Sequence, residues 1–279
     1  MKHPADSPIV DFRSPHVMAI VNVTPDSFYG ASRSMDEEQV VARVRQVVAE
    51  GASIIDIGGY SSRPGAAKVT LDEEWRRVEC GLRAVRGVSA DVAVSVDTFR
   101  SEIAERALAL DASVIINDIT GGDADSRIVD VVAEAGTPYV AMHMRGTPET
   151  MQSMTDYKDV VEAVAESLKR KAESLIAQGV APEKLILDPG FGFAKTAEQN
   201  FRLMAHLNRI CALGFPVLSG VSRKSMIYKT LDVTPEESLV GTTALNWESL
   251  RQGATILRVH DVREAVQTVR LFVEFERNR

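Results

Sequence analysis

Short, apolar, β-rich runs alternate with longer segments of helical periodicity along the whole chain, and there are eight such runs. Most of the runs are almost entirely apolar, as in strands of a parallel sheet that are buried on both faces. They cover residues 17–21, 53–57, 92–96, 114–116, 139–142, 185–187, 217–219 and 255–259. Because parallel strands need crossover connections, usually helices, this alternation predicts a parallel sheet covered by helices.

Helix-end signals fall between the runs. Four pairs have the spacing of an N-cap residue and the residue three positions later, which together satisfy free backbone amides. These pairs are Ser34 with Glu37, Thr70 with Glu73, Thr196 with Gln199 and Asp261 with Glu264. Thr234-Pro235 indicates another helix start, with proline at the first helical position.

No Pro/Ser-rich linker interrupts the strand–helix units, which favours one domain over two. We therefore predict an α/β protein with a single (β/α)₈ TIM barrel over residues 17–279, preceded by an N-terminal extension over residues 1–16. A doubly wound open sheet is the rival architecture on this pattern alone. With 279 residues, 45% of them hydrophobic, the chain has enough apolar surface for a sizeable core.

Charge and cysteine content exclude some classes of protein. The net charge of −7 argues against a broad nucleic-acid interface. An anionic ligand would need arginine and lysine concentrated at one site. Cys80 and Cys211 have no metal-binding or redox spacing, so we expect reduced thiols. Residues 1–16 lack a signal-peptide pattern, and no run reaches the roughly 18 apolar residues of a membrane span. We expect a cytoplasmic enzyme without a membrane partner.

A polar residue follows or closes every apolar run. One such residue would indicate a turn or a helix cap. Eight in succession indicate a shared polar pocket, because parallel strands of a barrel bring their carboxyl ends to one mouth, where such enzymes place their active sites. The residues are Asn22, Asp56, Asp97, Asn117, His143, Asp188, the segment 219–224, and Arg258 with His260.

These polar residues constrain the ligand. Carboxylates and an amide suit a flat heterocycle with several N–H groups; they are Asp97, Asn117 and Asp188. Cations suit phosphate or carboxylate groups; they are Arg63, Lys224, Arg258 and His260. Asn22 offers a hard oxygen for Mg²⁺, whereas we interpret His143 as a structural histidine. The pocket therefore suits a polar heterocycle joined to a phosphate-bearing leaving group.

Two loops contain Gly and Pro at several positions: residues 22–28 after the first strand and residues 58–65 after the second. Loops of this composition on a rigid barrel are candidates for lids that exclude water, although ordinary turns have the same composition. The glycines of the second loop do not have the spacing of a dinucleotide-binding fingerprint.

Seven motifs resemble, in order from the first strand to the last, those of the dihydropteroate synthases, a family of pterin-binding enzymes. They lie at residues 22–28, 56–65, 95–98, 117–119, 188–192, 222–225 and 258–260, and so span almost the whole chain. The resemblance implies a transferase of folate biosynthesis. Such an enzyme condenses 6-hydroxymethyl-7,8-dihydropterin diphosphate with p-aminobenzoate, which gives 7,8-dihydropteroate and pyrophosphate. It also implies a homodimer.

The resemblance further implies the role of individual residues. The pterin site would comprise Asp97, Asn117, Ile119, Met142, Asp188, Gly220 and Lys224. The diphosphate site would comprise Asn22, Ser62, Arg63, Arg258 and His260, with Mg²⁺ on Asn22. The p-aminobenzoate site, where sulfonamides would compete, would comprise Phe28, Arg63, Pro64, Phe193, Lys224 and Ser225. The catalytic residues among these would be Lys224, Asp97, Asp188 and Arg63.

The chain departs from the family's pattern in both loops. Residues 29–32 read Tyr-Gly-Ala-Ser where members often have Ser-Asp-Gly-Gly, so an acidic group that might assist magnesium is missing. Residues 60–62 read Tyr-Ser-Ser where Glu-Ser-Thr is commoner, and Ser62 keeps the hydroxyl. Three alternatives remain: a pterin-dependent methyltransferase on the same barrel, an aldolase with Lys224 as Schiff-base nucleophile, and a pterin-binding module without catalysis.

Overall fold

The computed structural model describes residues 10–23, 33–60, 68–147 and 150–279. Its eight strands form one parallel sheet in the order β6-β5-β4-β3-β2-β1-β8-β7. The strands are β1 His16–Asn22, β2 Ile54–Gly58, β3 Ala93–Asp97, β4 Ile115–Asp118, β5 Tyr139–Met142, β6 Leu185–Asp188, β7 Leu218–Ser219 and β8 Ile256–Val259. A parallel bridge between Leu187 and Val217 joins the two ends of the sheet.

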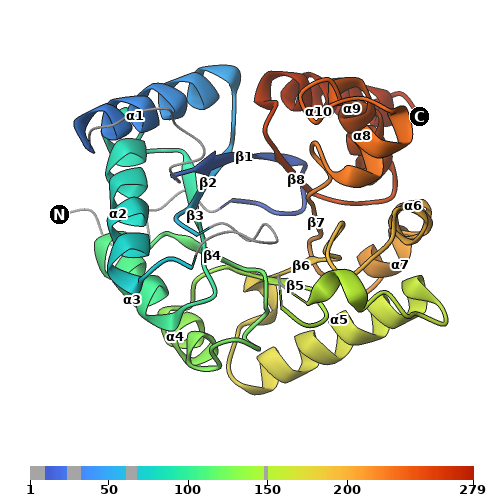
Figure 1. Cartoon of the computed structure of the whole chain (residues 1–279), viewed down its shortest axis with the longest axis horizontal. Helices are drawn as coiled ribbons and strands as arrows, with labels where there is room; N and C mark the ends of the chain where they lie inside the picture. The colour runs from blue at the N-terminus through green and yellow to red at the C-terminus, as the bar shows by residue number, and fades with distance from the viewer. Residues whose placement is uncertain (1–9, 24–32, 61–67, 148–149) are drawn as a thin grey trace.

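The helices form an outer ring around this sheet in chain order (Figure 1). They are α1 Arg33–Glu50, α2 Leu71–Val88, α3 Ser101–Leu110, α4 Arg127–Ala135, α5 Val160–Ala177, α6 Ala197–Ala205, α7 Asn208–Cys211, α8 Ser225–Leu231, α9 Leu239–Arg251 and α10 Val262–Arg277. Short 3₁₀ helices, η3 Met151–Ser153 and η4 Pro182–Lys184, lie between β5 and β6. The predicted TIM barrel is confirmed, and the open sheet is wrong because β6 and β7 meet.

Two of the predicted helix starts are confirmed. Thr70 accepts a hydrogen bond from the backbone N–H of Glu73 and caps α2. Thr196 and Gln199 form a reciprocal capping box at the start of α6. In both cases a side chain satisfies an amide that the first helical turn leaves free.

Of two other predicted helix starts, one is confirmed in position and one is wrong. Asp261 is the N-cap residue of α10, but its carboxylate makes no cap hydrogen bond, because it pairs with Arg223 instead. Thr234 and Glu237 do exchange hydrogen bonds, but they close a turn, and α9 begins only at Leu239. The fourth pair, Ser34 with Glu37, includes a side chain outside the described residues.

The interior of the barrel has an apolar floor. Each strand contributes one side chain to a separate core cluster: Met18, Ile54, Ala93, Ile115, Val140, Ile186, Leu218 and Ile256. Phe12, which precedes β1, packs against the same cluster. The alternate strand residues, such as Ile55 and Val94, belong to the larger core between sheet and helices. The division into residues 1–16 and 17–279 stays a prediction, and β1 itself begins at His16.

A polar layer lies above this floor. Side chains of a strand alternate between its two faces, so the residue two positions after a floor residue also points into the barrel. Four of these positions carry the predicted polar residues: Asp56, Asn117, Asp188 and Arg258. Asp97 lies four positions after Ala93 and therefore on the same face. The alternation of the strands thus places a polar layer on an apolar base.

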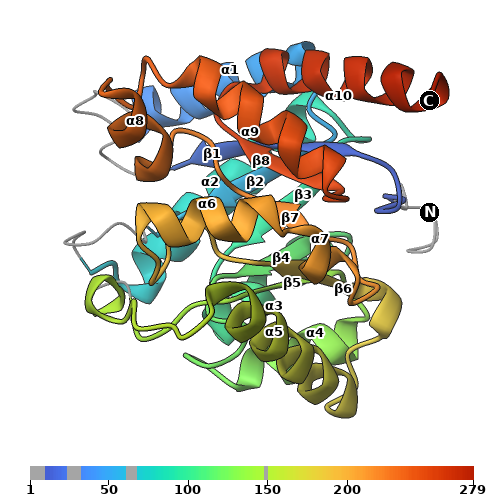
Figure 2. The same ribbon diagram turned by 90° about the vertical axis from the view of Figure 1, so that its right-hand side faces the viewer.

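The last two helices lie side by side over the strands that close the sheet. Figure 2 shows α9 and α10 next to each other, with β1 and β8 beneath them. Trp247 of α9 packs edge-to-face on Phe272 and Phe275 of α10. No helix in the described part of the chain is long and apolar enough to cross a membrane.

Candidate active site

Arg258 joins three strands inside the barrel. Its Nε donates to Oδ2 of Asp56 over 2.7 Å, and a terminal nitrogen donates to Oδ2 of Asp97, also over 2.7 Å. Asp56 is fully buried, whereas the side chains of Arg258 and Asp97 are 22% and 19% exposed. Burial works against the charge of Arg258, but the two carboxylates outweigh it and raise its pKa. The guanidinium is therefore a permanent cation inside the barrel.

Asn117 and Asn22 complete the side of the pocket formed by the first four strands. The amide of Asn117 donates to the carboxylate of Asp56, with distances of 3.2 and 3.4 Å to its oxygens. Oδ1 of Asn22 lies beside Gly58, where an added Cβ would be only 3.0 Å away. That Cβ position is also 3.9 Å from Cβ of Asp97. Glycine at position 58 thus leaves room for the Asn22 oxygen next to Asp97.

The two carboxylates predicted to hold a heterocycle resist ionisation. Burial raises the pKa of Asp97 to about 7, although Arg258 opposes this shift. Burial also raises the pKa of Asp188, while Lys224 and the backbone N–H of Gly190 favour its charged form. That N–H donates to Oδ1 of Asp188 over 2.7 Å. Such shifts are typical of groups in functional clefts.

Lys224 faces Asp188 across the mouth of the barrel. It is the residue before α8, and its Nζ donates to the carbonyl oxygen of Phe191. The same Nζ lies 4.7 Å from the centre of the Phe193 ring, within the range of a cation–π contact. Burial lowers the pKa of Lys224 to about 8, while the negative charge of Asp188 opposes this shift. The ammonium group therefore has a ring, a carbonyl and a carboxylate around it.

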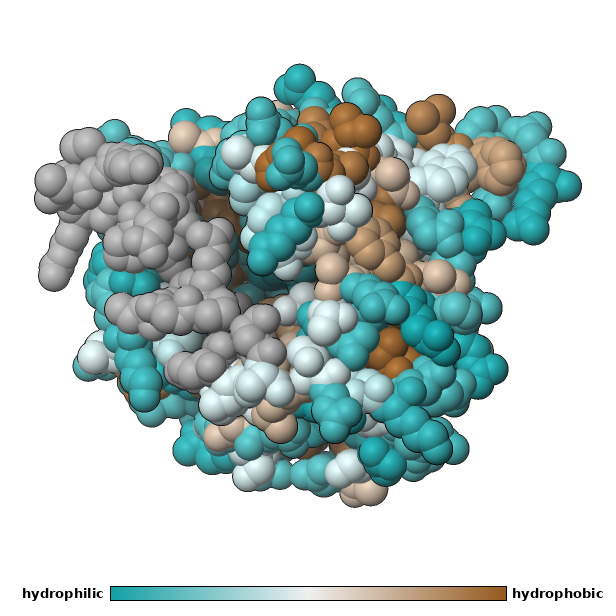
Figure 3. Space-filling model, turned by 45° about the vertical axis from the view of Figure 1, so that its right-hand side comes forward, coloured by the Kyte–Doolittle hydropathy of each residue, from teal (hydrophilic) through white to brown (hydrophobic). Residues whose placement is uncertain are grey.

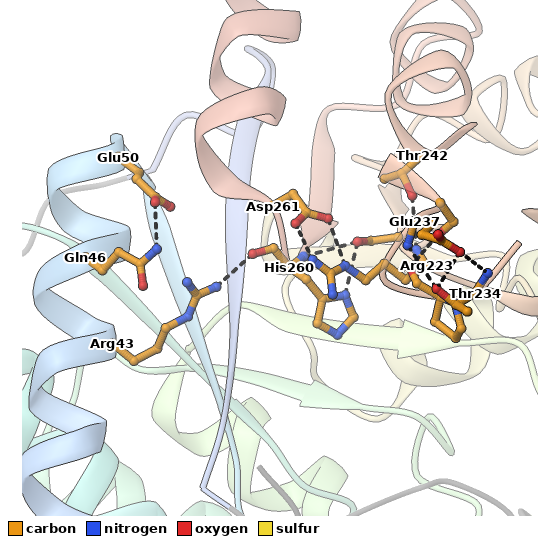
Figure 4. Close-up of polar contacts among 12 residues, drawn as sticks. Arg43, Gln46, Glu50, Arg223, Thr234, Glu237, Thr242, His260 and Asp261 are labelled. Carbon is orange, nitrogen blue, oxygen red and sulfur yellow. Dashed lines mark hydrogen bonds and ion pairs between the residues drawn. The ribbon is translucent and has the colours of Figure 1, made fainter. Parts of the chain in front are cut away.

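His260 is fixed at the outer rim. Its Nδ1 hydrogen-bonds with the hydroxyl of Ser222 over 3.0 Å, and Arg43 of α1 donates to its carbonyl oxygen over 2.7 Å. Figure 4 shows Arg43 and Arg223 on opposite sides of the segment formed by His260 and Asp261. These residues line a cavity of about 550 Å³. His260 thus borders a cavity at the rim, two residues after Arg258, whose side chain points into the barrel.

The other predicted site residues are buried, exposed or outside the described residues. Met142 is the register partner of Asp188 and is buried, as are Ile119 and Gly220. Ser225 is exposed at the start of α8. Four predicted residues lie outside the described part of the chain: Phe28, Ser62, Arg63 and Pro64. The same holds for residues 29–32, where the sequence departs from the family pattern. The ligand assigned to each residue stays a prediction.

Two residues of the site were not assigned from sequence. Asp56 is one of the strand-end polar residues, but the sequence does not indicate that it is the buried acceptor for Arg258 and Asn117. Its spacing of two from Ile54 would have indicated an inward direction. Lys195 is buried beside His143, with Nζ 3.1 Å from Nδ1. No local pattern around Lys195 distinguishes a buried lysine from a surface one.

His143 has the structural role that we expected. Burial lowers its pKa to about 3, helped by the positive charges of Lys195 and Arg145, so the ring is neutral. Within the described residues, no group of three or more His, Cys, Asp or Glu side chains is arranged to hold a metal ion. A metal in this pocket would therefore depend on few protein ligands.

Comparisons with known proteins identify the family of the chain. Residues 18–260 match the family model described as pterin binding enzyme. A dihydropteroate synthase from Synechocystis is 43% identical over 253 residues, which cover 90% of this chain and 87% of that protein. Dihydropteroate synthases of solved structure show the same barrel. The one from Yersinia pestis with a sulfonamide drug is 36% identical, with a TM-score of 0.89 and 96% of each chain covered. The one from Xanthomonas albilineans with 4-aminobenzoic acid is 37% identical, with a TM-score of 0.89 and the same coverage. The chain belongs to the pterin-binding enzymes and, among them, to the dihydropteroate synthases.

Proposed function

We propose that the chain condenses 6-hydroxymethyl-7,8-dihydropterin diphosphate with p-aminobenzoate, the reaction of the family to which it belongs. The observation that carries this proposal is one polar layer in which two buried carboxylates, Asp97 and Asp188, lie with two cations, Arg258 and Lys224. The carboxylates suit the amino and N–H groups of a pterin, because an acceptor pair can take parallel hydrogen bonds. The cations suit the anionic parts of the two substrates.

The carboxylates also have a role in the reaction. As the C–O bond to the diphosphate breaks, positive charge develops on the exocyclic methylene and spreads over the pterin ring. Fixed negative groups in an environment poor in water stabilise such a charge more than water does. The amine of p-aminobenzoate then forms the new C–N bond and loses a proton. This substitution at carbon needs no covalent bond to the enzyme, so Lys224 serves as a cation and not as a nucleophile.

Arg258, His260 and Asn22 are proposed to receive the diphosphate. Arg258 donates from Nε to Asp56 and from one terminal nitrogen to Asp97. A guanidinium has five N–H donors in all. The remaining donors are available to an oxyanion. The residues present also fit Mg²⁺, because the Asn22 oxygen and Asp97 both border Gly58, and Mg²⁺ needs only one or two protein oxygens when phosphates and waters supply the rest. When bound, the ion would neutralise charge on the departing pyrophosphate.

The p-aminobenzoate is proposed to lie next to Lys224 and Phe193. The ring of Phe193 and the ammonium of Lys224 are already in contact, and together they offer an apolar wall and a cation. An aromatic carboxylate matches that pair of features. A sulfonamide drug, as bound by the Yersinia pestis relative, should compete for the same place.

Product formation tests the proposed reaction. Folded protein, Mg²⁺ and both substrates should give dihydropteroate and pyrophosphate in equal amounts, and a sulfonamide should raise the apparent KM for p-aminobenzoate without changing kcat. Asp188→Asn should lower the rate strongly, since it removes the fixed negative charge at the pterin. No product from well-folded protein with both substrates present would refute the proposal.

We also propose that the chain forms a homodimer through its last helices. Four of the six exposed large hydrophobic residues in the described part of the chain lie there: Leu231, Val240, Leu271 and Phe275. Figure 3 shows hydrophobic atoms gathered on this side of the molecule. Exposed apolar patches of monomers are usually small, and larger ones mark interfaces. For location we propose the cytoplasm, supported by Cys80 and Cys211, which are not joined in a disulfide, as expected in a reducing compartment.

A further inference from the structure

Lys195 is buried, yet it takes part in none of the ion pairs found among the described residues. Only 6% of the residue is exposed. Its Nζ donates to the carbonyl oxygens of Gly190 and Phe193, over 2.9 and 3.1 Å, and lies 3.1 Å from Nδ1 of His143. An ammonium group has three N–H donors, so these three acceptors use all of them. Burial of a lysine costs free energy of folding unless its N–H donors are hydrogen-bonded in this way. We therefore ask which part of the structure these three contacts hold.

The contacts of Lys195 hold one side of the loop that follows β6. Gly190 accepts from Lys195 with its carbonyl group and donates with its N–H to Asp188 over 2.7 Å. Gly190 has a φ of +67°, and an added Cβ would lie 2.1 Å from the carbonyl oxygen of His143. Glycine is therefore required here. Asp188 holds its N–H, and Lys195 holds its carbonyl oxygen.

The same loop carries the surroundings of Lys224. The carbonyl oxygen of Phe191 accepts from Lys224, and the ring of Phe193 lies under its ammonium group. The carbonyl group of Phe193 in turn accepts from Lys195. Two lysines thus bind the carbonyl groups of one loop: Lys224 binds that of Phe191, and Lys195 binds those of Gly190 and Phe193.

We propose that Lys195 is a positioning residue, which holds the loop 189–194 in the shape that presents Asp188 and Lys224 to the pterin. It touches neither substrate in this role. It acts through the Gly190 peptide on Asp188 and through the Phe191–Phe193 segment on Lys224. Asn200 supports the outer end of the loop, because its side chain accepts from the N–H of Gly192 over 2.7 Å. This inference rests on the proposed pterin site.

Binding of separate ligands to the Lys195→Met variant tests the inference. Methionine fills a similar volume but donates no hydrogen bond. We expect calorimetry to show at least a tenfold weaker affinity for 6-hydroxymethylpterin, because Asp188 and Lys224 lose their fixed positions. Affinity for pyrophosphate with Mg²⁺ should change less than twofold, because Arg258 and His260 lie on β8 and the segment after it. A general loosening of the barrel would weaken both ligands alike.

The control is Lys169→Met, an exposed lysine on α5, which should leave both affinities unchanged. If Lys195→Met does not fold, Lys195→Gln keeps two donors without the charge and should weaken pterin binding threefold to tenfold. Equal losses for the two ligands, or pterin affinity within twofold of the unsubstituted protein in a folded variant, would overturn the inference. Failure of the unsubstituted protein to bind 6-hydroxymethylpterin would instead refute the pterin site itself.

Discussion

Lys224 keeps an ammonium group where burial lowers its pKa to about 8. Replacement by alanine should lower kcat/KM by about 10²–10³-fold, the usual effect of removing one preorganised charge-stabilising group. Thermal melting should shift little, because the Lys224 side chain is only partly buried at the mouth. The matched control is Lys229→Ala on the exposed face of the same helix, which should leave the rate unchanged. Pyrophosphate release measures both variants, and near-normal kinetics of Lys224→Ala would remove this residue from the site.

The pKa values of Asp97 and Lys224 predict a narrow pH optimum. Asp97, with its pKa raised to about 7, must be ionised to stabilise a cation, so kcat/KM should fall as the pH drops below that value. Lys224, with its pKa lowered to about 8, must be protonated, so kcat/KM should fall as the pH rises above that value. The profile of the free enzyme should therefore have its maximum between these two values. Lys224→Arg should move only the alkaline limb upward, and an alkaline limb that stays in place would contradict its assignment.

Arg258 links whole elements, because its guanidinium joins β8 to β2 and β3. Arg258→Ala should reduce the free energy of unfolding by about 3–5 kcal/mol, since it leaves Asp56 buried without its cation. The double variant Arg258→Ala with Asp56→Asn should recover part of this loss, because an amide carries no uncompensated charge. Denaturant unfolding of the single and double variants gives both values. A double variant as unstable as Arg258→Ala alone would show that the loss has another origin.

Arg258→Ala also tests whether Arg258 binds the diphosphate or the pterin part of the substrate. Because the proposed role of Arg258 is to bind the diphosphate, the variant should bind pterin diphosphate much more weakly, by about tenfold or more, the usual loss of a charged hydrogen bond. The affinity for free 6-hydroxymethylpterin should fall less, since this ligand has no phosphate group for Arg258 to bind. Calorimetry at a temperature where the variant is folded compares the two ligands. Equal losses would contradict the assigned role.

For strands and helices, the sequence predicts those features that depend on residues close together along the chain. The apolar runs place every strand within two residues, and the polar residues at their ends converge as expected. The spacing of Thr196 and Gln199 finds a helix cap, because both partners are local. Asp261 has the same spacing but pairs with Arg223, which is distant in sequence. Lys195 is buried for the same kind of reason, since the acceptors that satisfy it include His143, on another strand–helix unit.

The whole molecule separates stability from chemistry along the barrel axis. The floor cluster, with Phe12 beneath it, and the larger core outside the sheet are apolar and hold the strands together. The polar layer above them contains buried carboxylates with raised pKa values, which cost stability at neutral pH. A barrel can carry that cost because the apolar layers are contributed by all eight strands. Four of the strands thus provide one residue for folding and, two positions later, a polar residue of the site.

The last helices allow a test at the scale of the assembly. Val240 and Leu271 are 80% and 67% exposed on α9 and α10, so replacing them removes almost no packing within the chain. The double variant Val240→Glu with Leu271→Glu should weaken self-association at least tenfold, because charges would have to be buried in the proposed interface. Its thermal melting at low protein concentration should match that of the unsubstituted monomer. The control is Leu110→Glu, an exposed apolar residue on α3, which should leave association unchanged. Sedimentation velocity over a concentration series measures all three proteins, and a double variant that dimerises as tightly as the unsubstituted chain would place the interface elsewhere.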